Sequence, residues 1–379
     1  MKYKSKIVHS NSIDQCTGAS SIPIYQASTF AQEDPIRFGK YEYARGANPT
    51  RDALENIIAE LEGGEVGCAF SSGMAAISSV FLLFKPGDHV VVGEDVYGGT
   101  YRILTTIFQQ WQLKTTFVDS TDIDQLKRAI KPETKAIYVE TPSNPVLKIT
   151  DLKAVAELAK EKGIFAITDN TFMTPYLQRP IEQGFDIVIH SATKFLGGHS
   201  DLIAGLTVTA NKELGHKLSF IQKAFGAILG PMDSWLVMRG IKTLSARMEA
   251  QQKSAEEIAK WLTKQQGVKK VYYPTLPEHK DRAIHLRQTS GGGAVLSFEL
   301  ENKEKTIKFL RTVKLPLLAV SLGGVESILS YPATMSHAAM PEKERIKRGI
   351  SDSLVRLSVG LEDVEDLKED IDNALKQLR

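Results

Sequence analysis

The sequence has few of the features that mark secreted or membrane proteins. Only two cysteines, Cys16 and Cys68, occur in 379 residues, without Cys-x-x-Cys spacing, so we interpret them as small hydrophobic side chains rather than a disulfide or metal site. The N-terminal residues contain no apolar run that could form a signal-peptide core. No hydrophobic run approaches the roughly 20 residues that cross a bilayer. We therefore expect a cytoplasmic protein without a bound metal.

An excess of one charge is also missing. The 47 Lys and Arg residues nearly balance the 45 Asp and Glu residues, and the net charge is +2. This balance argues against a basic face for nucleic acid or membranes. A hydrophobic fraction of 42% with 24% charged residues is typical of a soluble globular enzyme. The expected partner is therefore a small molecule.

Apolar segments alternate with amphipathic helical segments up to about residue 240. Runs rich in β-branched residues, typical of buried strands, occur at 66–70, 89–93, 115–119, 136–140, 165–169, 186–190 and 204–209. Helical segments such as 151–162 separate these runs. Since this order is typical of a parallel sheet covered on both faces, we predict an α/β fold with a mostly parallel, seven-stranded sheet.

The chain divides into three regions by its pattern. Residues 1–50 show neither helical nor strand periodicity and predict an extended arm. Residues 51–243 form the predicted large domain. In residues 244–379 the pattern predicts a smaller α/β domain, with a long helix at 245–266 and strands near 294–300, 317–321 and 354–359.

Chemically unusual residues lie at the ends of three of the predicted strands, 66–70, 165–169 and 186–190, where ligands bind in open parallel sheets. Lys194 follows the strand 186–190, and a lysine whose charge is suppressed by burial can form an imine with an aldehyde ligand. The hydroxyls of Ser191 and Thr193 precede this lysine and can donate to a phosphate. The alternative is an ordinary solvated lysine in a loop.

Two further positions have both a functional and an ordinary interpretation. Asp169, at the end of 165–169, can pair with a protonated pyridinium nitrogen, or it can simply cap the following turn. Gly73 and Met74 open a predicted helix after Ser72, and glycine there lets backbone N–H groups approach an anion. Many helices begin with serine and glycine as simple caps, so this signal is weak alone.

Six motifs together carry a resemblance that covers nearly the whole chain. They are SSGMAA, YGGTYR, ETPSNP, TDNTF, HSATKFLGGHSD and SLGGVES. In this order they resemble the Cys/Met-metabolism family of fold-type I enzymes that depend on pyridoxal 5′-phosphate (PLP). The family includes cystathionine γ-synthase, cystathionine γ-lyase, cystathionine β-lyase and methionine γ-lyase. The resemblance implies a fold-type I transferase fold and PLP as the cofactor.

The resemblance also implies roles for residues around the cofactor. Lys194 would bind PLP covalently and shuttle the substrate proton, while Asp169 would bind the ring nitrogen. Tyr97 would stack on the PLP ring, although a core or surface tyrosine is the alternative. Asn144 would donate to the phenolic oxygen, although it also suits a turn before Pro145.

The resemblance also implies that some residues contact a neighbouring subunit and that others bind the substrate. Tyr43 and Arg45 would hold the PLP phosphate of a neighbouring subunit, which implies a homotetramer with shared active sites. Arg356, supported by Ser321, would bind the substrate α-carboxylate. For an arginine in an apolar strand, a buried salt bridge is the alternative.

The choice of reaction within the family depends on small differences. Gly99 stands where methionine γ-lyases carry a cysteine, and the segment 319–322, followed by YPATMSHAAMP, resembles cystathionine β-lyases of Gram-positive type. Arg102 and Glu326 instead match positions that recognise the distal end of the substrate in γ-type enzymes. We expect a cystathionine β-lyase of methionine biosynthesis, with cystathionine γ-lyase or γ-synthase as alternatives. An aminotransferase and an inactive PLP-fold binding protein are the rivals outside this group.

Overall fold

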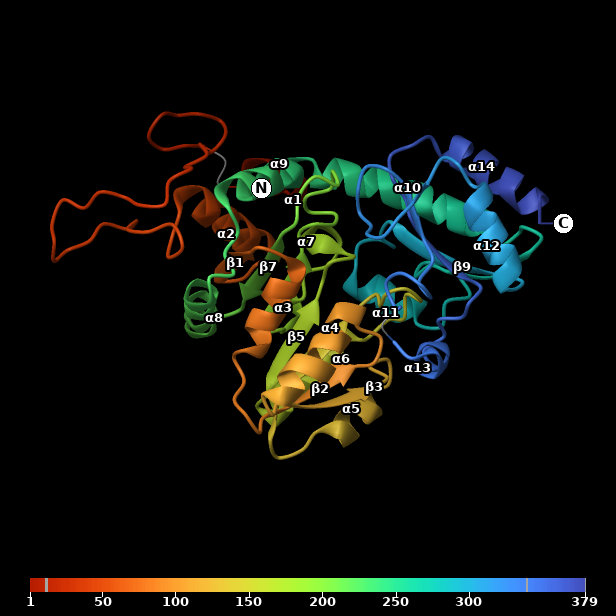
Figure 1. The fold of residues 1–379 in the computed structure, drawn as a ribbon, viewed down its shortest axis with the longest axis horizontal. Helices are drawn as coiled ribbons and strands as arrows, with labels where there is room; N and C mark the ends of the chain where they lie inside the picture. Colours follow the sequence, from red (N-terminus) through yellow and green to blue (C-terminus); the bar gives the residue numbers. More distant parts are fainter. Residues whose placement is uncertain (11–12, 339, 379) are drawn as a thin grey trace.

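The fold is described by a computed structural model for residues 1–10, 13–338 and 340–378. Two sheets form its framework, a seven-stranded sheet of order β1-β7-β6-β5-β4-β2-β3 and a five-stranded sheet of order β10-β11-β12-β9-β8 (Figure 1). In the larger sheet, β2 to β6 are mutually parallel wherever they pair, while β7 runs antiparallel to β1 and β6. The predicted α/β class with a mostly parallel sheet is therefore confirmed.

The strands of the larger sheet lie within a residue or two of their predicted positions. They are β1 (Val66–Phe70), β2 (His89–Gly93), β3 (Lys114–Val118), β4 (Thr134–Glu140), β5 (Phe165–Asp169), β6 (Ile187–Ser191) and β7 (Gly205–Thr209). Val90 and Val92 of β2 pack into one buried cluster and Val91 into another. Successive side chains point to opposite faces of a strand, so the continuous apolar runs reflect a sheet covered on both sides.

Helices cover both faces of this sheet. They are α2 (Pro49–Glu62), α3 (Gly73–Phe81), α4 (Gly98–Ile103), the π-helix η1 (Leu104–Phe108), α5 (Ile123–Ala129), α6 (Leu152–Lys162), α7 (Thr174–Leu177), the 3₁₀-helix η2 (Ile181–Gln183), α8 (Lys212–Phe225) and α9 (Pro231–Lys242). Helices α2 and α6 both end at a left-handed glycine, Gly63 and Gly163, as the sequence indicates.

The smaller sheet contains strands that the sequence analysis missed. Its elements are α10 (Leu244–Leu262), β8 (Val268–Tyr272), α11 (Arg282–Gln288), β9 (Val295–Leu300), α12 (Lys303–Thr312), β10 (Leu317–Leu318), β11 (Ile328–Ser330), α13 (Glu342–Lys347), β12 (Leu354–Ser358) and α14 (Val364–Lys376). Strands β8 and β11 were not predicted, because β8 carries two exposed lysines and β11 has three residues. Helix α10 reaches from the large sheet to the small one (Figure 1).

The N-terminal region differs from the prediction at its start. Residues Tyr3–His9 form helix α1, whose Ile7 is buried in the core beside α2 and α9. The sequence shows no helical periodicity here because only one side chain of the helix is buried, so the helix was not predicted. Residues 13–48, between α1 and α2, are mostly irregular and extend away from the rest of the chain (Figure 1). The division into the three regions 1–50, 51–243 and 244–379 remains a prediction.

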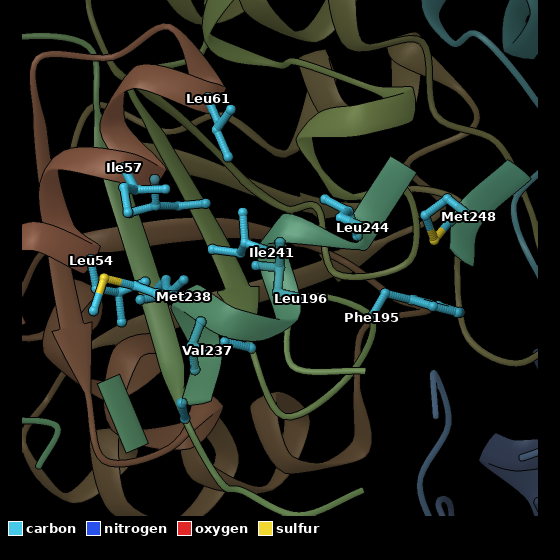
Figure 2. Close-up of a cluster of buried hydrophobic side chains, with 14 of the residues drawn as sticks. Leu54, Ile57, Leu61, Phe195, Leu196, Val237, Met238, Ile241, Leu244 and Met248 are labelled. Carbon is cyan, nitrogen blue, oxygen red and sulfur yellow. The ribbon is translucent and has the colours of Figure 1, made fainter. Parts of the chain in front are cut away.

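A buried cluster fixes the loop that follows β6. Figure 2 shows Phe195 and Leu196 within a cluster that includes Val237, Ile241 and Met248 from helices α9 and α10. Phe195 and Leu196 are almost fully buried. Burial of two such side chains contributes about 3–6 kcal/mol, so the backbone at Lys194 is firmly anchored. Among the described residues, no helix is both long and apolar enough to span a bilayer.

Candidate active site

A cavity of about 560 Å³ lies at the carboxyl ends of β4, β5 and β6, closed on one side by loops of the small sheet. This is where ligands bind in open parallel sheets. The predicted site residues that line it are Lys194, Asp169, Tyr97, Gly73, Met74, Asn144, Ser191, Thr193, Arg356, Ser321 and Arg102. The structure therefore gathers most of the predicted site in one place.

Lys194 is the cation of this cavity whose charge is most easily removed. Burial, assisted by the positive charge of Arg356, lowers the pKa of Lys194 to about 8. Its Nζ donates to the Ser321 hydroxyl at 2.5 Å. A hydroxyl does not neutralise an ammonium group as a carboxylate would. The amine is therefore available in neutral form near physiological pH, which imine formation with an aldehyde requires.

Ser321 meets Lys194 because two loops approach very closely. A Cβ at Gly323 would lie 2.7 Å from the backbone nitrogen of Phe195, so only glycine fits there. Ser321 itself has φ +92°, in the left-handed region that is unfavourable for a side chain. Unfavourable backbone conformations cluster at functional sites. The position of Ser321 is thus held by its surroundings.

Asp169 combines the two interpretations that the sequence left open. Its Oδ1 accepts the Thr171 N–H at 2.9 Å, so it caps the following turn. The same carboxyl lines the cavity and is buried, and burial raises its pKa despite hydrogen bonds from Thr171. A buried carboxyl without an ion-pair partner among the described residues favours a cationic ligand group, such as a pyridinium.

The start of α3 forms a small cradle against β6. Ser72 caps the helix by accepting the Ala75 N–H at 3.0 Å, as the ordinary interpretation predicts. A Cβ at Gly73 would lie 3.0 Å from both Cβ and Oγ of Ser191, so glycine keeps this gap open. The Thr193 hydroxyl, which accepts the Ala204 N–H, completes the polar lining. Hydroxyls beside a helix N-terminus suit a phosphate group.

Tyr97 is held by its backbone rather than its ring. It is the N-cap residue of α4, and its N–H donates to Glu140 Oε2 at 2.7 Å. The ring lines the cavity, and the side chain is 40% exposed, so it is not a core tyrosine. A Cβ at Gly99 would lie 2.4 Å from the ring and 2.6 Å from the Met74 sulfur. An aromatic face is therefore available to a flat ligand.

Arg356 is a buried cation with neutral partners. Its guanidinium donates to Asn144 Oδ1 at 2.8 Å, to the Ser321 carbonyl at 2.7 Å and to Ser330 Oγ at 2.8 Å. No ion pair of Arg356 is present among the described residues, so the salt-bridge interpretation is wrong. The charge is thus left to a ligand carboxylate, which a guanidinium binds in a bidentate manner.

Three predicted residues lie away from this cavity. Tyr43 and Arg45 are exposed on the N-terminal segment, where Arg45 Nη1 donates to the Lys223 carbonyl at 2.7 Å. Glu326 is exposed and accepts from the Ser200 hydroxyl at 3.4 Å. Neither Tyr43 nor Arg45 is among the described residues that line the cavity of their own chain.

A buried carboxyl and a buried imidazole of the lining, Glu140 and His337, were not predicted from the sequence. Glu140 ends β4 as Asp169 ends β5, and this equivalent position was the signal that could have revealed it. His337 lies in a turn segment without periodicity, and burial lowers its pKa to about 4, assisted by nearby arginines. Ala339 of the same segment lies outside the described residues. His337 is therefore neutral at physiological pH.

Comparison with known proteins agrees with this geometry. A model of the family described as "Cys/Met metabolism PLP-dependent enzyme" matches residues 4–376. The chain belongs to this family. It is 56% identical over 376 residues to cystathionine beta-lyase MetC of Bacillus subtilis (99% of this chain, 96% of the relative). It is also 52% identical over 379 residues to cystathionine gamma-lyase of the same organism, covering both chains completely.

A solved structure extends the comparison to the fold. The cystathionine gamma-lyase from Lactobacillus plantarum, complexed with L-serine, has a TM-score of 0.97 and 46% sequence identity, covering 100% of this chain and 99% of that one. The predicted family and its PLP cofactor are thereby confirmed. The donor set described above fits this cofactor, with an amine for its aldehyde, a carboxyl for its ring nitrogen and a helix N-terminus for its phosphate.

Proposed function

We propose that the chain is a carbon–sulfur lyase that cleaves cystathionine at the bond between Cβ and sulfur. The products are homocysteine, pyruvate and ammonia. The observation that carries this proposal is the uncompensated Arg356 beside a lysine of low pKa in one cavity. Such a pair binds an amino-acid carboxylate and removes the α-proton next to it. The 56% identity to a cystathionine beta-lyase supports the choice of substrate.

The positions of the chain's own residues support a role for each of them. PLP, when bound, supplies an electron sink for the carbanion formed at Cα. Arg356 holds the α-carboxylate, and Lys194 Nζ accepts the α-proton and returns a proton later. Asp169 would keep the ring nitrogen protonated, and Tyr97 would cover the ring face. Ser191, Thr193 and the Gly73–Met74 backbone would bind the phosphate, and Asn144 would donate to the phenolic oxygen.

Cleavage on the γ side is a second candidate. The 52% identity to a cystathionine gamma-lyase is close to the 56% identity to a beta-lyase. Arg102 lines the cavity and suits the distal carboxylate of the substrate, whereas Glu326 lies outside the lining. Of the two residues that favour γ-chemistry, Arg102 lines the cavity and Glu326 does not, which supports β-cleavage.

Product analysis tests the proposed reaction. The purified protein is incubated with PLP and cystathionine, and the keto acid is identified. We expect pyruvate with homocysteine. Formation of 2-oxobutyrate with cysteine would establish γ-cleavage instead. Turnover only of an O-acylhomoserine with cysteine, giving cystathionine, would establish the synthase.

The site of the cofactor is tested separately. Reduction of the yellow holoenzyme with borohydride fixes the label covalently, and peptide mapping should place it on Lys194. A label on another lysine would overturn the assignment. Replacement of Lys194 by alanine should remove the yellow colour and turnover together.

We also propose that the protein works as a homotetramer with shared sites. Tyr43 and Arg45 are exposed on a segment that extends from the body, and neither is among the described residues that line the cavity of their own chain. Arg45 lies 5.7 Å from the ring centroid of Tyr43, so the two side chains are presented together. A phosphate in a neighbouring subunit is a suitable ligand for this pair.

A further inference from the structure

Two carboxyl groups lie side by side at the floor of the cavity. Glu140 and Asp169 are register partners at the ends of the adjacent parallel strands β4 and β5. They are 8% and 6% exposed, and both line the cavity. Two neighbouring carboxylates in a buried site repel each other, so both cannot remain ionised without a compensating cation. The ring nitrogen of PLP would supply one such cation, with Asp169 as its partner.

Among the described residues, no cation forms an ion pair with Glu140. Arg356 of β12 faces it, but its guanidinium donates to neutral oxygens of Asn144, Ser321 and Ser330, and its charge is left to the substrate carboxylate. Lys148 is paired with Asp95 at 2.6 Å. The other charged or titratable groups that face Glu140 are Asp169 on β5, Asp95 after β2, and Tyr138 on its own strand. Burial, and after it the charge of Asp169, raises the pKa of Glu140 well above its ordinary value.

Glu140 also has a structural task at the cofactor. Tyr97 has no side-chain cap of its own for α4, and its N–H donates to Glu140 Oε2 at 2.7 Å. The Asn144 backbone lies near the same carboxyl and lowers its pKa slightly. Tyr97 and Asn144 are the residues proposed to contact the ring and its phenolic oxygen. The Glu140 carboxyl therefore fixes the backbone at Tyr97 and lies beside the backbone of Asn144.

We propose that Glu140 is a positioning residue that functions as a neutral carboxylic acid. Its carbonyl oxygen accepts from Tyr97 and thereby sets the ring face against which PLP lies. Because Glu140 carries its own proton, Asp169 remains the single negative charge at the ring nitrogen. The inference rests on the proposed roles of Tyr97, Asn144 and Asp169, and it does not depend on which bond of cystathionine is cleaved.

Matched replacements at the two carboxyl groups test the proposal through PLP affinity. Glu140→Ala should weaken PLP binding about tenfold, equivalent to the loss of one capping hydrogen bond. Glu140→Gln keeps a neutral acceptor oxygen and should restore the affinity to within about threefold of wild type. Asp169→Asn is the matched control at the charged position and should weaken binding at least ~100-fold. Equal loss in Glu140→Gln and Glu140→Ala would overturn the proposal.

Infrared spectroscopy gives a readout independent of binding and turnover. The wild-type minus Glu140→Gln difference spectrum of the holoenzyme at neutral pH should contain the carbonyl stretch of a protonated carboxyl group. The Asp169→Asn difference spectrum should contain a carboxylate band instead. A carboxylate band from Glu140 would contradict the assignment. Failure of the wild type to cleave cystathionine would refute the proposed reaction and leave this measurement unaffected.

Discussion

Lys194 Nζ donates to Ser321 Oγ at 2.5 Å, and this bond joins the loop after β6 to the loop that precedes β11. The ammonium is buried there without a carboxylate among its described partners. Burial first, and the charge of Arg356 second, lowers its pKa from 10.5 to about 8. The charged form is thus disfavoured in the folded protein relative to the unfolded chain.

This shift predicts how the stability of the PLP-free protein depends on pH. Between about pH 8 and 10.5 the unfolded chain binds more protons at Lys194 than the folded protein, so stability rises with pH in this window. Below about pH 8, the burial of the Lys194 charge lowers the free energy of unfolding by about 3 kcal/mol. Lys194→Met should therefore stabilise the PLP-free protein by about 2–3 kcal/mol at pH 7, and the gain should vanish above pH 10.5. Urea unfolding at the two pH values measures the effect.

Lys148 is the matched control for this lysine. Burial opposes its charge, but Asp95, Asp119 and Glu94 outweigh burial and raise its pKa. Lys148→Met should therefore destabilise the protein at pH 7. A stabilising Lys148→Met, or a destabilising Lys194→Met, would contradict the electrostatic account.

The backbone of Ser321 predicts a difference between two small replacements. Its φ of +92° is accessible to glycine and unfavourable for residues with a Cβ. Ser321→Ala and Ser321→Gly both remove the hydroxyl that accepts from Lys194. Ser321→Gly should nevertheless be about 1 kcal/mol more stable than Ser321→Ala, because only alanine retains the unfavourable conformation. Equal unfolding free energies would show that no strain is stored at this position.

Much of this site was predictable because strand ends are visible in the sequence. Asp169 and Lys194 follow apolar runs that the structure confirms as β5 and β6. Glu140 ends a strand in the same way but was missed, because its motif drew attention to Asn144. Strand direction was not predictable, since the apolar run of β7 looks the same in a parallel or antiparallel strand.

Long-range contacts were the least predictable part. Arg356 binds Asn144, which lies 212 positions earlier, and this contact depends on how the small sheet packs on the large one. No local pattern encodes such an approach. The neutral partners of Arg356, in place of the salt bridge considered from the sequence, could be seen only in three dimensions.

The neutral partners of Arg356 predict a specific defect in substrate binding. Arg356→Lys replaces a planar fork by a single ammonium, which cannot bind a carboxylate in the same bidentate way. The KM for cystathionine should rise about 100-fold, a loss of about 2.7 kcal/mol. Steady-state kinetics measures it. Arg345, which is paired with Asp352 at 2.6 Å and lies outside the cavity lining, is the matched control. Arg345→Lys should alter stability and leave KM within about twofold.

The exposed arm predicts complementation between inactive subunits. If Arg45 acts on the phosphate of a neighbouring subunit, a subunit carrying Arg45→Ala still has an intact Lys194, and a subunit carrying Lys194→Ala still has an intact arm. Each variant alone should be inactive or nearly so. Mixed by co-expression, they should regain activity, because some sites then combine a wild-type lysine with a wild-type arm.

Controls separate this exchange from simple rescue of folding. Arg37 lies on the same exposed segment, and no contact between its side chain and the phosphate is predicted. The Arg37→Ala variant, without any partner variant, should therefore retain activity. Light scattering on each mixture confirms that subunits have associated. Associated mixtures of Arg45→Ala and Lys194→Ala that remain inactive would show that Arg45 serves its own chain, for example through its bond to the Lys223 carbonyl at the end of α8.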